Sequence, residues 1–416
     1  MRFCPLLLLV VLAAADVLKT VYVKTLAQLV AAMEDPEVGR IFLNASITLE
    51  GSPLPTIDGR LLEIEANPDA CEAPCTLFGA GGRIFNVGGQ PGGLILAGLT
   101  LRDARGGEGN GSAVYVAAGV GQGSGMLSVN AVRFVNNSAA GDGGAVWAGH
   151  RAILSLAGCD FEENSALHGG AVAGYGVQLG VSESTFRRNA AAVAGGALAL
   201  EGGNASLSLS SSLLEENGAG AEGGGALSLG GAAKDRSLAS LGVVTCGMHA
   251  VTLRNNSARG PGGAIRCGPF GQLAANGCDL SANVGAGRGG ALALDAPNPS
   301  AITNTSFRDN VLVDGAAGGA ALCFGSDPSG RAPASLAASV LHNATFQRND
   351  IQSGAGRGAL LLLEGELIFA SSAFSENVIR GREDDVCAFG ADTAALFKPA
   401  EKPSACGPCA GRGVCA

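Results

Sequence analysis

The sequence predicts an all-β chain that winds as a parallel β-solenoid, with a short helix capping its N-terminal end. Three observations favour this fold class. Glycine makes up 66 of the 416 residues, about 16% against a usual ~7%, while charged residues are only 15% of the chain. Two short phrases of sequence alternate along most of the chain. Apolar and small residues alternate beside both phrases with period two, which is the period of a β-strand.

The composition also excludes several classes of protein. With 47% hydrophobic residues the chain can bury a large core, and its glycines follow no triplet register, so neither wholesale disorder nor a collagen helix is expected. The 36 acidic and 27 basic residues give a net charge of −9. A nucleic-acid partner would need a basic face, so this charge argues against one and against anionic membranes.

Residues 1–15 are predicted to be a signal peptide. Arg2 precedes an apolar run from Leu6 to Leu12 that ends in three alanines, and this run is too short to span a bilayer. A buried first strand is the alternative. Seven Asn-x-Ser/Thr sequons, some of which chance alone would supply, are compatible with a glycosylating secretory pathway: Asn44, Asn110, Asn136, Asn204, Asn255, Asn304 and Asn343.

Residues 16–60 are predicted to form the N-terminal cap of the solenoid. Thr25 followed three residues later by Gln28 has the form of a capping box, and the apolar residues between 26 and 33 lie on one helical face. A short helix is therefore expected between strands near 20–24 and 40–49. The end of a solenoid needs such a cap, because its strand edges are otherwise open.

Residues 61–390 are predicted to form the coils, on the basis of the two phrases. The first phrase is an apolar residue, two variable residues and an asparagine. Its nine copies are Phe134 with Asn137, Phe161 with Asn164, Phe186 with Asn189, Leu214 with Asn217, Leu253 with Asn256, Leu280 with Asn283, Phe307 with Asn310, Phe346 with Asn349 and Phe374 with Asn377. The second phrase is Gly-Gly-Ala followed by alternating apolar residues, beginning at Gly143, Gly169, Gly195, Gly224, Gly262, Gly289 and Gly318.

A unit of about 27 residues is also typical of leucine-rich repeats and of helical pairs. Helical pairs are disfavoured because each interior glycine costs a helix roughly 1 kcal/mol. Leucine-rich repeats would show a fixed ladder of leucines, which is missing. A β-solenoid is therefore favoured. Coils stacked at about 4.8 Å would align the Phe/Leu positions as an apolar core. Each asparagine is expected to adopt the left-handed conformation at a bend and to donate its amide to the next coil. The glycines are expected where φ is positive or where coils leave no room for a Cβ.

The alternation of these phrases resembles the repeat of the chlamydial polymorphic outer membrane proteins, over about residues 95–380. It is also similar to the right-handed parallel β-helix, or pectin-lyase-like, superfamily of secreted proteins. The resemblance implies a right-handed helix and, loosely, surface display or adhesion, because one fold hosts many functions. Two intervals of 39 residues imply insertions near 230–246 and 325–339, which must leave a solenoid as loops and are where binding is expected.

The terminal and local cysteines suggest two further features. Cys71 and Cys75 are close enough in sequence for a local disulfide. Residues 391–416 are predicted to be a linker and an incomplete tail, in which Cys406, Cys409 and Cys415 resemble the opening of an EGF-like module. Such a module usually has six cysteines, so the alternatives are a truncated chain, which is favoured, and a free tail.

The cysteines in the middle of the chain are expected to be buried thiols. Cys159 and Cys278 occupy the same register four coils apart, which at about 4.8 Å per coil is far beyond the Cα separation of a disulfide. Cys267 and Cys323 are expected to share another register two coils apart. Most of these residues are therefore interpreted as small apolar core residues.

No catalytic, cofactor or metal site is predicted. The superfamily that the chain resembles contains pectate lyases and polygalacturonases, but the Asn-Thr-Asp and Gly-His-Gly motifs of the hydrolases do not occur. Asp384-Asp385 is the only adjacent aspartate pair, and Asp160 and Asp279 share a register four coils apart. The four histidines are scattered, and His150, beside an arginine, comes nearest to an acid/base pair.

The sequence thus predicts a secreted or surface-displayed, non-catalytic rod with a structural, adhesion or glycan-binding role, and extracellular glycans or surface proteins as partners. Two alternatives stay open. One is a polysaccharide-degrading lyase or hydrolase of the same fold. The other is the ectodomain of a larger protein whose membrane anchor lies beyond Ala416.

Overall fold

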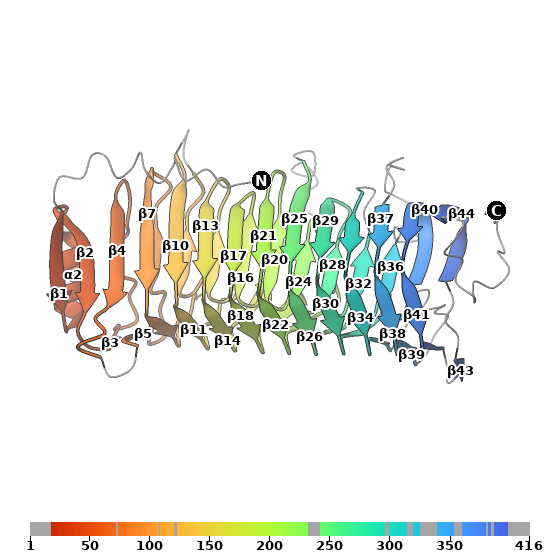
Figure 1. Ribbon diagram of the computed structural model, residues 1–416. Coiled ribbons are helices and arrows are strands. Elements are labelled where there is room, and N and C mark those ends of the chain that lie inside the picture. The colour runs from red at the N-terminus through yellow and green to blue at the C-terminus, as the bar shows by residue number, and fades with distance from the viewer. Residues whose placement is uncertain are drawn as a thin grey trace.

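The computed structural model describes residues 18–71, 74–107, 109–119, 123–231, 242–295, 299–313, 319–324, 339–352, 360–379, 382–383 and 387–397. These residues wind into an elongated rod of stacked coils, with its helix at the N-terminal end (Figure 1). The predicted signal peptide, the tail after residue 397 and most of both predicted insertions lie outside the described residues.

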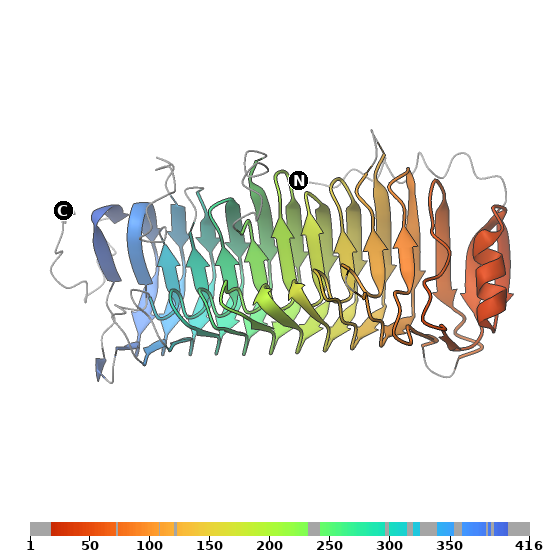
Figure 2. The same cartoon turned by 180° about the vertical axis from the view of Figure 1, so that it is seen from behind.

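The N-terminal end is closed by a strand, a helix and a second strand: β1 (Lys19–Val23), α2 (Leu26–Glu34) and β2 (Val38–Leu43). The Thr25 hydroxyl accepts a hydrogen bond from the Gln28 backbone N–H at 3.3 Å and so caps the helix. The helix buries Leu29 and Met33 against the first coils, and Figure 2 shows it lying across the end of the rod. Because these apolar residues cover the opening of the core, the first coil is shielded from water.

Each regular coil contains four strands. One such coil consists of β13 (Ile153–Ala157), β14 (Asp160–Glu162), β15 (Ser165–His168) and β16 (Val172–Tyr175). Strand β17 (Gln178–Ser182) then begins the next coil and pairs with β13 in parallel. Every strand of one coil thus has its counterpart on the next, which produces long ladders along the rod.

The 23-stranded sheet contains two of these ladders, which meet in β40 because that strand pairs with both. The first, called here the long-strand ladder, continues through β4 (Leu61–Ala66), β7 (Gly92–Ala97), β10 (Gly125–Asn130), β13, β17, β21 (Ser206–Ser210), β25 (Val244–His249), β29 (Gly271–Asn276), β33 (Ala301–Thr303), β37 (Ser339–His342), β40 (Leu360–Ala370) and β44 (Cys387–Phe397). The second, the glycine ladder, contains β6 (Phe85–Val87), β9 (Val114–Val116), β12 (Val146–Ala148), β16, β20 (Leu198–Glu201), β24 (Leu227–Leu229), β28 (Ile265–Cys267), β32 (Leu292–Leu294) and β36 (Leu322–Phe324).

Two further sheets complete the coils. The phenylalanine sheet contains β3 (Ile47–Thr48), β5 (Thr76–Phe78), β8 (Thr100–Arg102), β11 (Arg133–Val135), β14, β18 (Thr185–Arg187), β22 (Leu213–Glu215), β26 (Thr252–Arg254), β30 (Asp279–Ser281), β34 (Ser306–Arg308), β38 (Thr345–Gln347) and β41 (Ala373–Ser375). The nine-stranded sheet contains β15, β19 (Ala190–Ala194), β23 (Gly218–Ala219), β27 (Ser257–Ala258), β31 (Val284–Gly285), β35 (Val311–Leu312), β39 (Asp350–Ile351), β42 (Val378–Ile379) and β43 (Arg382–Glu383). Among the described strands, only β42 and β43 pair antiparallel. The predicted fold class, a right-handed parallel β-helix, is confirmed.

From β11 to β41, the apolar residue of the first phrase is the central residue of each strand of the phenylalanine sheet and packs in the core. Phe134, Phe161 and Phe186 stack with ring centroids 4.5 and 4.6 Å apart, and Phe307, Phe346 and Phe374 form a second stack. Between the two stacks, Leu214, Leu253 and Leu280 occupy the same column. The column is continuous because equivalent residues of adjacent coils are aligned by the parallel ladders.

The asparagines of the first phrase form a buried chain of amides at the bend between the phenylalanine sheet and the nine-stranded sheet. The Asn164 Nδ2 donates to Asn189 Oδ1 on the next coil at 2.9 Å and to the Phe134 carbonyl on the previous coil at 3.0 Å. The Asn164 Oδ1 accepts from both the side-chain and the backbone nitrogen of Asn137. An amide has two donor hydrogens and two acceptor lone pairs, so each internal asparagine is fully hydrogen-bonded although it is buried.

The expectation that these asparagines adopt the left-handed conformation is wrong. Positive φ occurs one residue earlier, for example 51° at Asn136, 56° at Glu163 and 53° at Arg188. The reason is geometric: the preceding residue makes the bend, and the asparagine side chain can then point inward to the amide chain. The side chain of the bend residue faces outward, which explains why acidic, basic and amide residues all occupy this position.

The two glycines of the second phrase have the two roles that the sequence predicts. Gly195 has a φ of +66°, whereas Gly196 has no such φ but lies so close to the next coil that a Cβ would be 2.1 Å from the Gly225 carbonyl oxygen. The first glycine therefore allows the turn into the glycine ladder. The second allows the close approach of consecutive coils.

Ion pairs connect consecutive coils on the outer side of the phenylalanine sheet. Arg254 Nη2 lies 2.9 Å from Glu215 Oε1, Arg308 Nη2 lies 2.8 Å from an Asp279 oxygen, and Arg348 pairs with Asp309. The arginines of these pairs are largely exposed, so solvent screens the pairs and they add little to stability. This outer face thus carries many charged side chains, and acidic and basic ones pair with each other across consecutive coils.

Two predicted positions need correction. Cys267 and Cys323 do not share a register: Cys323 pairs with Ala293, which pairs with Arg266, while Cys267 aligns with Leu294. The Ala291 N–H donates to the carbonyl of residue 321 rather than 320, which shows that the segment before β36 holds one additional alanine.

The end of the coils also differs from the prediction. Strand β44 continues to Phe397 along β40, so the ladder extends past residue 390, where the sequence places the end of the coils.

Candidate functional site

A shallow groove of about 370 Å³ lies on the outer side of the long-strand ladder. It crosses four consecutive strands, β21, β25, β29 and β33, which lie near the middle and towards the C-terminal end of the rod (Figure 1). Its floor is a column of small residues and one side is a column of polar residues. The floor consists of Ser208, Gly247, Ala274 and Ala301, and the polar side of Ser210, His249, Asn276 and Thr303.

The alternation of each strand builds both columns. In β21, Leu207 and Leu209 point into the core, so the three serines of Ser206–Ser210 point outward. Parallel pairing aligns Ser208 with Gly247 and Ser210 with His249 on the next coil, and the same register continues to β33. Small side chains on the middle column leave the hollow, and the neighbouring column supplies hydroxyl, imidazole and amide groups.

The whole face around this groove is uncharged. From Gly93 in β7 to His342 in β37, no outward-facing residue of the described long strands is Asp, Glu, Lys or Arg. The phenylalanine sheet, by contrast, carries ion pairs on its outer side. The long-strand face therefore suits a neutral polar ligand rather than an ionic one.

Hydrogen bonds at the edge of the groove involve the side-chain amide of Asn276, which lies in its polar column. Asn304, directly after β33, donates from Nδ2 to Asn276 Oδ1 at 2.9 Å, and Asn343 donates from Nδ2 to Asn304 Oδ1 at 2.8 Å. All three asparagines are exposed. The Asn276 oxygen thus accepts a hydrogen bond from Asn304 at the edge of the groove.

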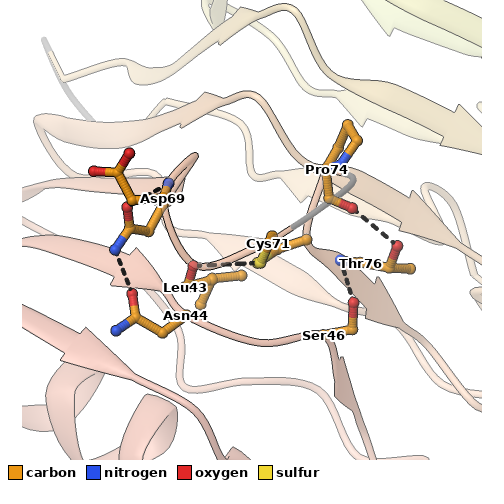
Figure 3. Close-up of a disulfide and its surroundings, with 9 residues drawn as sticks. Leu43, Asn44, Ser46, Asp69, Cys71, Pro74 and Thr76 are labelled. Atoms are coloured by element: carbon orange, nitrogen blue, oxygen red, sulfur yellow. Dashed lines mark hydrogen bonds between the residues drawn. A yellow bond between two sulfur atoms is a disulfide. The ribbon is translucent and has the colours of Figure 1, made fainter.

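The other residues singled out in the sequence lie away from the groove. Cys71 and Cys75 form a disulfide with Cα atoms 5.7 Å apart, beside the Leu43 backbone near the N-terminal end (Figure 3). None of the seven sequon asparagines lines the groove, although Asn304 and Asn343 lie at its edge. Asp384-Asp385 and the three tail cysteines are outside the described residues.

Asp160 and Asp279 lie on different coils, in β14 and β30. Asp160 pairs with Arg133 and Asp279 with Arg308, so each aspartate belongs to a separate ion pair. His150 is exposed, whereas His168 is buried and its Nδ1 lies 2.7 Å from Asp142 Oδ1. Sequence reasoning missed this last pair because its members are 26 residues apart and are brought together only by coil stacking.

A buried ionic cluster lies on the outer side of the glycine ladder. Asp295 accepts from Arg266 Nε at 3.2 Å and from Arg288 Nη2 at 2.5 Å, and all three side chains are at most 15% exposed. Burial raises the pKa of the nearby Cys323 thiol to about 12, although the Arg288 charge opposes the shift. A protonated thiol is a poor nucleophile, so we interpret the cluster as a structural one.

The described residues offer neither a metal centre nor a spanning helix. Within them, no group of three or more His, Cys, Asp or Glu side chains could hold a metal ion. Helix α2, in the same described part of the chain, lacks the length and the apolar character needed to cross a bilayer.

Comparisons with known proteins identify one stretch of the repeat and one distant structural likeness. Residues 131–149 match the family model described as the Chlamydia polymorphic membrane protein repeat. This segment contains Phe134, Asn137 and the first Gly-Gly-Ala phrase, so the match covers one set of both repeated phrases. No curated protein sequence matches the chain.

Among solved structures, the catalytic domain of a GH87 alpha-1,3-glucanase in complex with tetrasaccharides is similar to the chain, with 13% sequence identity and a TM-score of 0.34. The alignment covers 92% of this chain and 69% of the glucanase chain. At this identity and TM-score the likeness says nothing about activity. The chain is a parallel β-helix that carries a repeat of the kind found in the Chlamydia polymorphic membrane proteins.

Proposed function

We propose that the protein is an extracellular or surface-displayed rod that binds neutral glycans on its long-strand face without cleaving them. The observation that carries this proposal is the chemistry of the groove over β21 to β33. It combines a floor of small residues with hydroxyl, amide and imidazole groups, and it contains no Asp, Glu, Lys or Arg. Sugar hydroxyls both donate and accept hydrogen bonds, so neutral polar side chains of this kind suit them.

The extended shape of the groove favours a chain over a compact ligand. Equivalent residues on consecutive coils repeat at about 4.8 Å along the rod. A polymer that lies across β21, β25, β29 and β33 would therefore meet the same polar column on every coil. Several weak contacts along one chain add up, which is how an open and shallow site can bind a polymer usefully.

The charges support neutral polysaccharides as the ligand class. An acidic polysaccharide would need cations in the groove, and the described long-strand face between β7 and β37 has no Lys or Arg facing outward. The net charge of −9 adds a general repulsion towards polyanions. A glycan of uncharged hexoses or pentoses meets neither obstacle.

The lining of the groove also supports binding without cleavage. Glycoside hydrolysis normally uses two carboxyl groups about 5 to 10 Å apart that flank the scissile bond. None of the residues that line the groove is Asp or Glu. The sequon asparagines and the match to the repeat of a family of surface membrane proteins support the surface location.

A binding panel tests the proposal. Purified protein is mixed with immobilised neutral polysaccharides, such as glucans, xylans and mannans, and with acidic ones, such as pectate and alginate, with and without calcium. We expect retention on at least one neutral polymer, undiminished by chelator, with no new reducing ends or unsaturated sugars after prolonged incubation. Calcium-dependent binding to acidic polymers alone, or release of sugar products, would instead support the enzyme alternative. Absence of binding across the panel would refute the proposed role.

A further inference from the structure

We infer that the structure divides the seven sequons into two groups, and that N-linked glycans are attached at four exposed asparagines and absent from three packed ones. The four expected acceptors are Asn204, Asn255, Asn304 and Asn343. The three expected to stay bare are Asn44, Asn110 and Asn136. This inference concerns covalent modification and does not depend on what the groove binds.

The four expected acceptors share an exposed position at a corner of a coil. All four are exposed and have positive φ, between 50° and 64°. All four side chains are exposed at these corners, so an oligosaccharide on Nδ2 can extend into solvent, although the Nδ2 atoms of Asn304 and Asn343 also contact an asparagine of the preceding coil. The hydrogen bonds from Asn304 and Asn343 use one amide hydrogen each, and a glycosylated amide keeps one hydrogen for this purpose.

The three remaining asparagines are only partly exposed, and neighbouring groups engage them. The Asn44 Oδ1 accepts from Asn67 Nδ2 at 2.8 Å, beside the Cys71–Cys75 disulfide (Figure 3). The Asn110 Oδ1 accepts from the Asp142 backbone at 2.8 Å. At both places Oδ1 is held against a neighbouring segment and the side chain is only partly exposed, so an oligosaccharide on Nδ2 has less open space than at the four exposed positions.

Asn136 and Asn255 form a matched pair that isolates the effect of packing. Both belong to the tripeptide Asn-Asn-Ser, both occupy the bend before the amide chain, and their φ values are 51° and 55°. The Asn136 Nδ2 donates to Asp103 Oδ1 at 2.7 Å, and its carbonyl accepts from Arg105 at 2.7 Å, whereas Asn255 is exposed. Identical sequons in identical registers are therefore expected to differ in occupancy.

Three of the expected glycans would border the long-strand face. Asn204 lies two residues before β21, while Asn304 and Asn343 directly follow β33 and β37. One edge of the groove would thus carry one oligosaccharide and the other edge two. The face between them would stay open to a single polymer chain but would be screened from broad protein surfaces.

Site-resolved mass spectrometry tests the inference. The full chain is secreted from a eukaryotic host, released from its glycans by peptide N-glycosidase in H₂¹⁸O, and each asparagine is scored for conversion to labelled aspartate. We expect high occupancy at Asn204, Asn255, Asn304 and Asn343, and little at Asn44, Asn110 and Asn136. Comparable labelling of all seven sites, or absence of glycan from the four exposed ones, would overturn the inference.

Two single substitutions at the hydroxyl residue of the sequon supply a control that leaves each asparagine in place. Ser257→Ala is expected to remove one glycan from the secreted protein, seen as one step in gel mobility and intact mass. Ser138→Ala, in the matched sequon of Asn136, is expected to leave both unchanged. The opposite pattern would show that packing does not determine occupancy. Secretion of each variant reports folding separately, so a folding failure is not mistaken for a missing glycan.

Discussion

The Asn217 side-chain amide donates to Asn256 Oδ1 at 3.0 Å although 39 residues separate the two positions. The next link, from Asn256 to Asn283, has the same length across only 27 residues. The extra residues between Asn217 and Asn256 therefore do not disturb the stacking of the coils. This tolerance follows from the architecture, because each coil is held by its neighbours and not by the length of chain that connects them.

Interrupting the amide chain is predicted to be strongly destabilising. Asn256→Ala removes the acceptor of the Asn217 amide and the donor to the Leu214 carbonyl, and leaves these buried groups without partners. We expect a loss of about 3 kcal/mol or more in the free energy of unfolding. Chemical denaturation of the variant checks this value. Ser208→Ala, on the exposed face, should stay within about 0.5 kcal/mol of the parent, and a loss for Asn256→Ala as small as this would contradict the account.

The phenylalanine stack is predicted to tolerate leucine better than alanine. Phe161 lies between Phe134 and Phe186 and is fully buried, so Phe161→Ala leaves a cavity that costs about 3–5 kcal/mol. Phe161→Leu should cost clearly less, because Leu214 occupies the same column two coils away. Thermal unfolding of both variants gives the comparison. Equal destabilisation would mean that ring stacking, and not the filling of the column, dominates.

Gly196 and Gly247 are predicted to respond in opposite ways to substitution by alanine. A Cβ at Gly196 would lie 2.1 Å from a carbonyl oxygen of the next coil, so Gly196→Ala should prevent the coils from closing and yield little folded protein. A Cβ at Gly247 would meet no atom within 4 Å, and its φ is not positive. Gly247→Ala should therefore be neutral or slightly stabilising. Soluble yield and melting temperature report both outcomes, and the reverse order would contradict the close approach of the coils at Gly196.

Buried thiols are predicted to make the fold sensitive to alkaline pH. Burial raises the pKa of Cys267 and of Cys323 to about 12, whereas an unfolded cysteine ionises near about 8.5. The folded pKa is the higher one, so the stabilisation is complete below about pH 8.5 and is lost as pH rises towards 12. The melting temperature should therefore fall between pH 7 and pH 10.

The double variant Cys267→Ala, Cys323→Ala isolates the thiol contribution, since lysines, tyrosines and other groups titrate in the same range. Its melting temperature should fall less over this interval than that of the parent. In the native parent at pH 7, the five described free cysteines should not react with a thiol reagent until the protein is denatured. A decline of equal size in parent and variant would exclude these thiols as the cause.

The coil repeat could be predicted from sequence because it depends on residues that recur locally. Phe-x-x-Asn and Gly-Gly-Ala each fix one bend, and parallel stacking then aligns them without further information. The position of the left-handed residue could not be predicted: Asn136, Glu163 and Arg188 occupy the bend, and these residue types have little in common. The predicted register of Cys323 was wrong because one additional alanine before β36 moves the side chains of that strand by one position.

The groove could not be predicted from the sequence because its residues come from four strands that are far apart in the chain. Ser208, Gly247, Ala274 and Ala301 are ordinary residues when taken singly and become a column only through pairing. A signal was nevertheless present. The outward positions of the long strands lack charge over many coils, whereas the strands that contain Phe161 or Leu280 have acidic residues beside them, namely Asp160, Glu162 and Asp279.

The most direct test of the proposed function is a titration of the best neutral polysaccharide from the panel into three proteins: the parent, Gly247→Gln and Gly180→Gln. Both glycines face outward in the long-strand ladder. A Cβ at Gly180 would come no closer than 3.9 Å to another residue, and a Cβ at Gly247 would meet no atom within 4 Å, so both positions have room for a side chain.

Of these two glycines, only Gly247 lines the groove. We predict that Gly247→Gln weakens binding at least tenfold, because its side chain fills the floor of the groove, while Gly180→Gln matches the parent. Unchanged affinity of Gly247→Gln, with both variants folded, would contradict the assignment of the groove as the binding site.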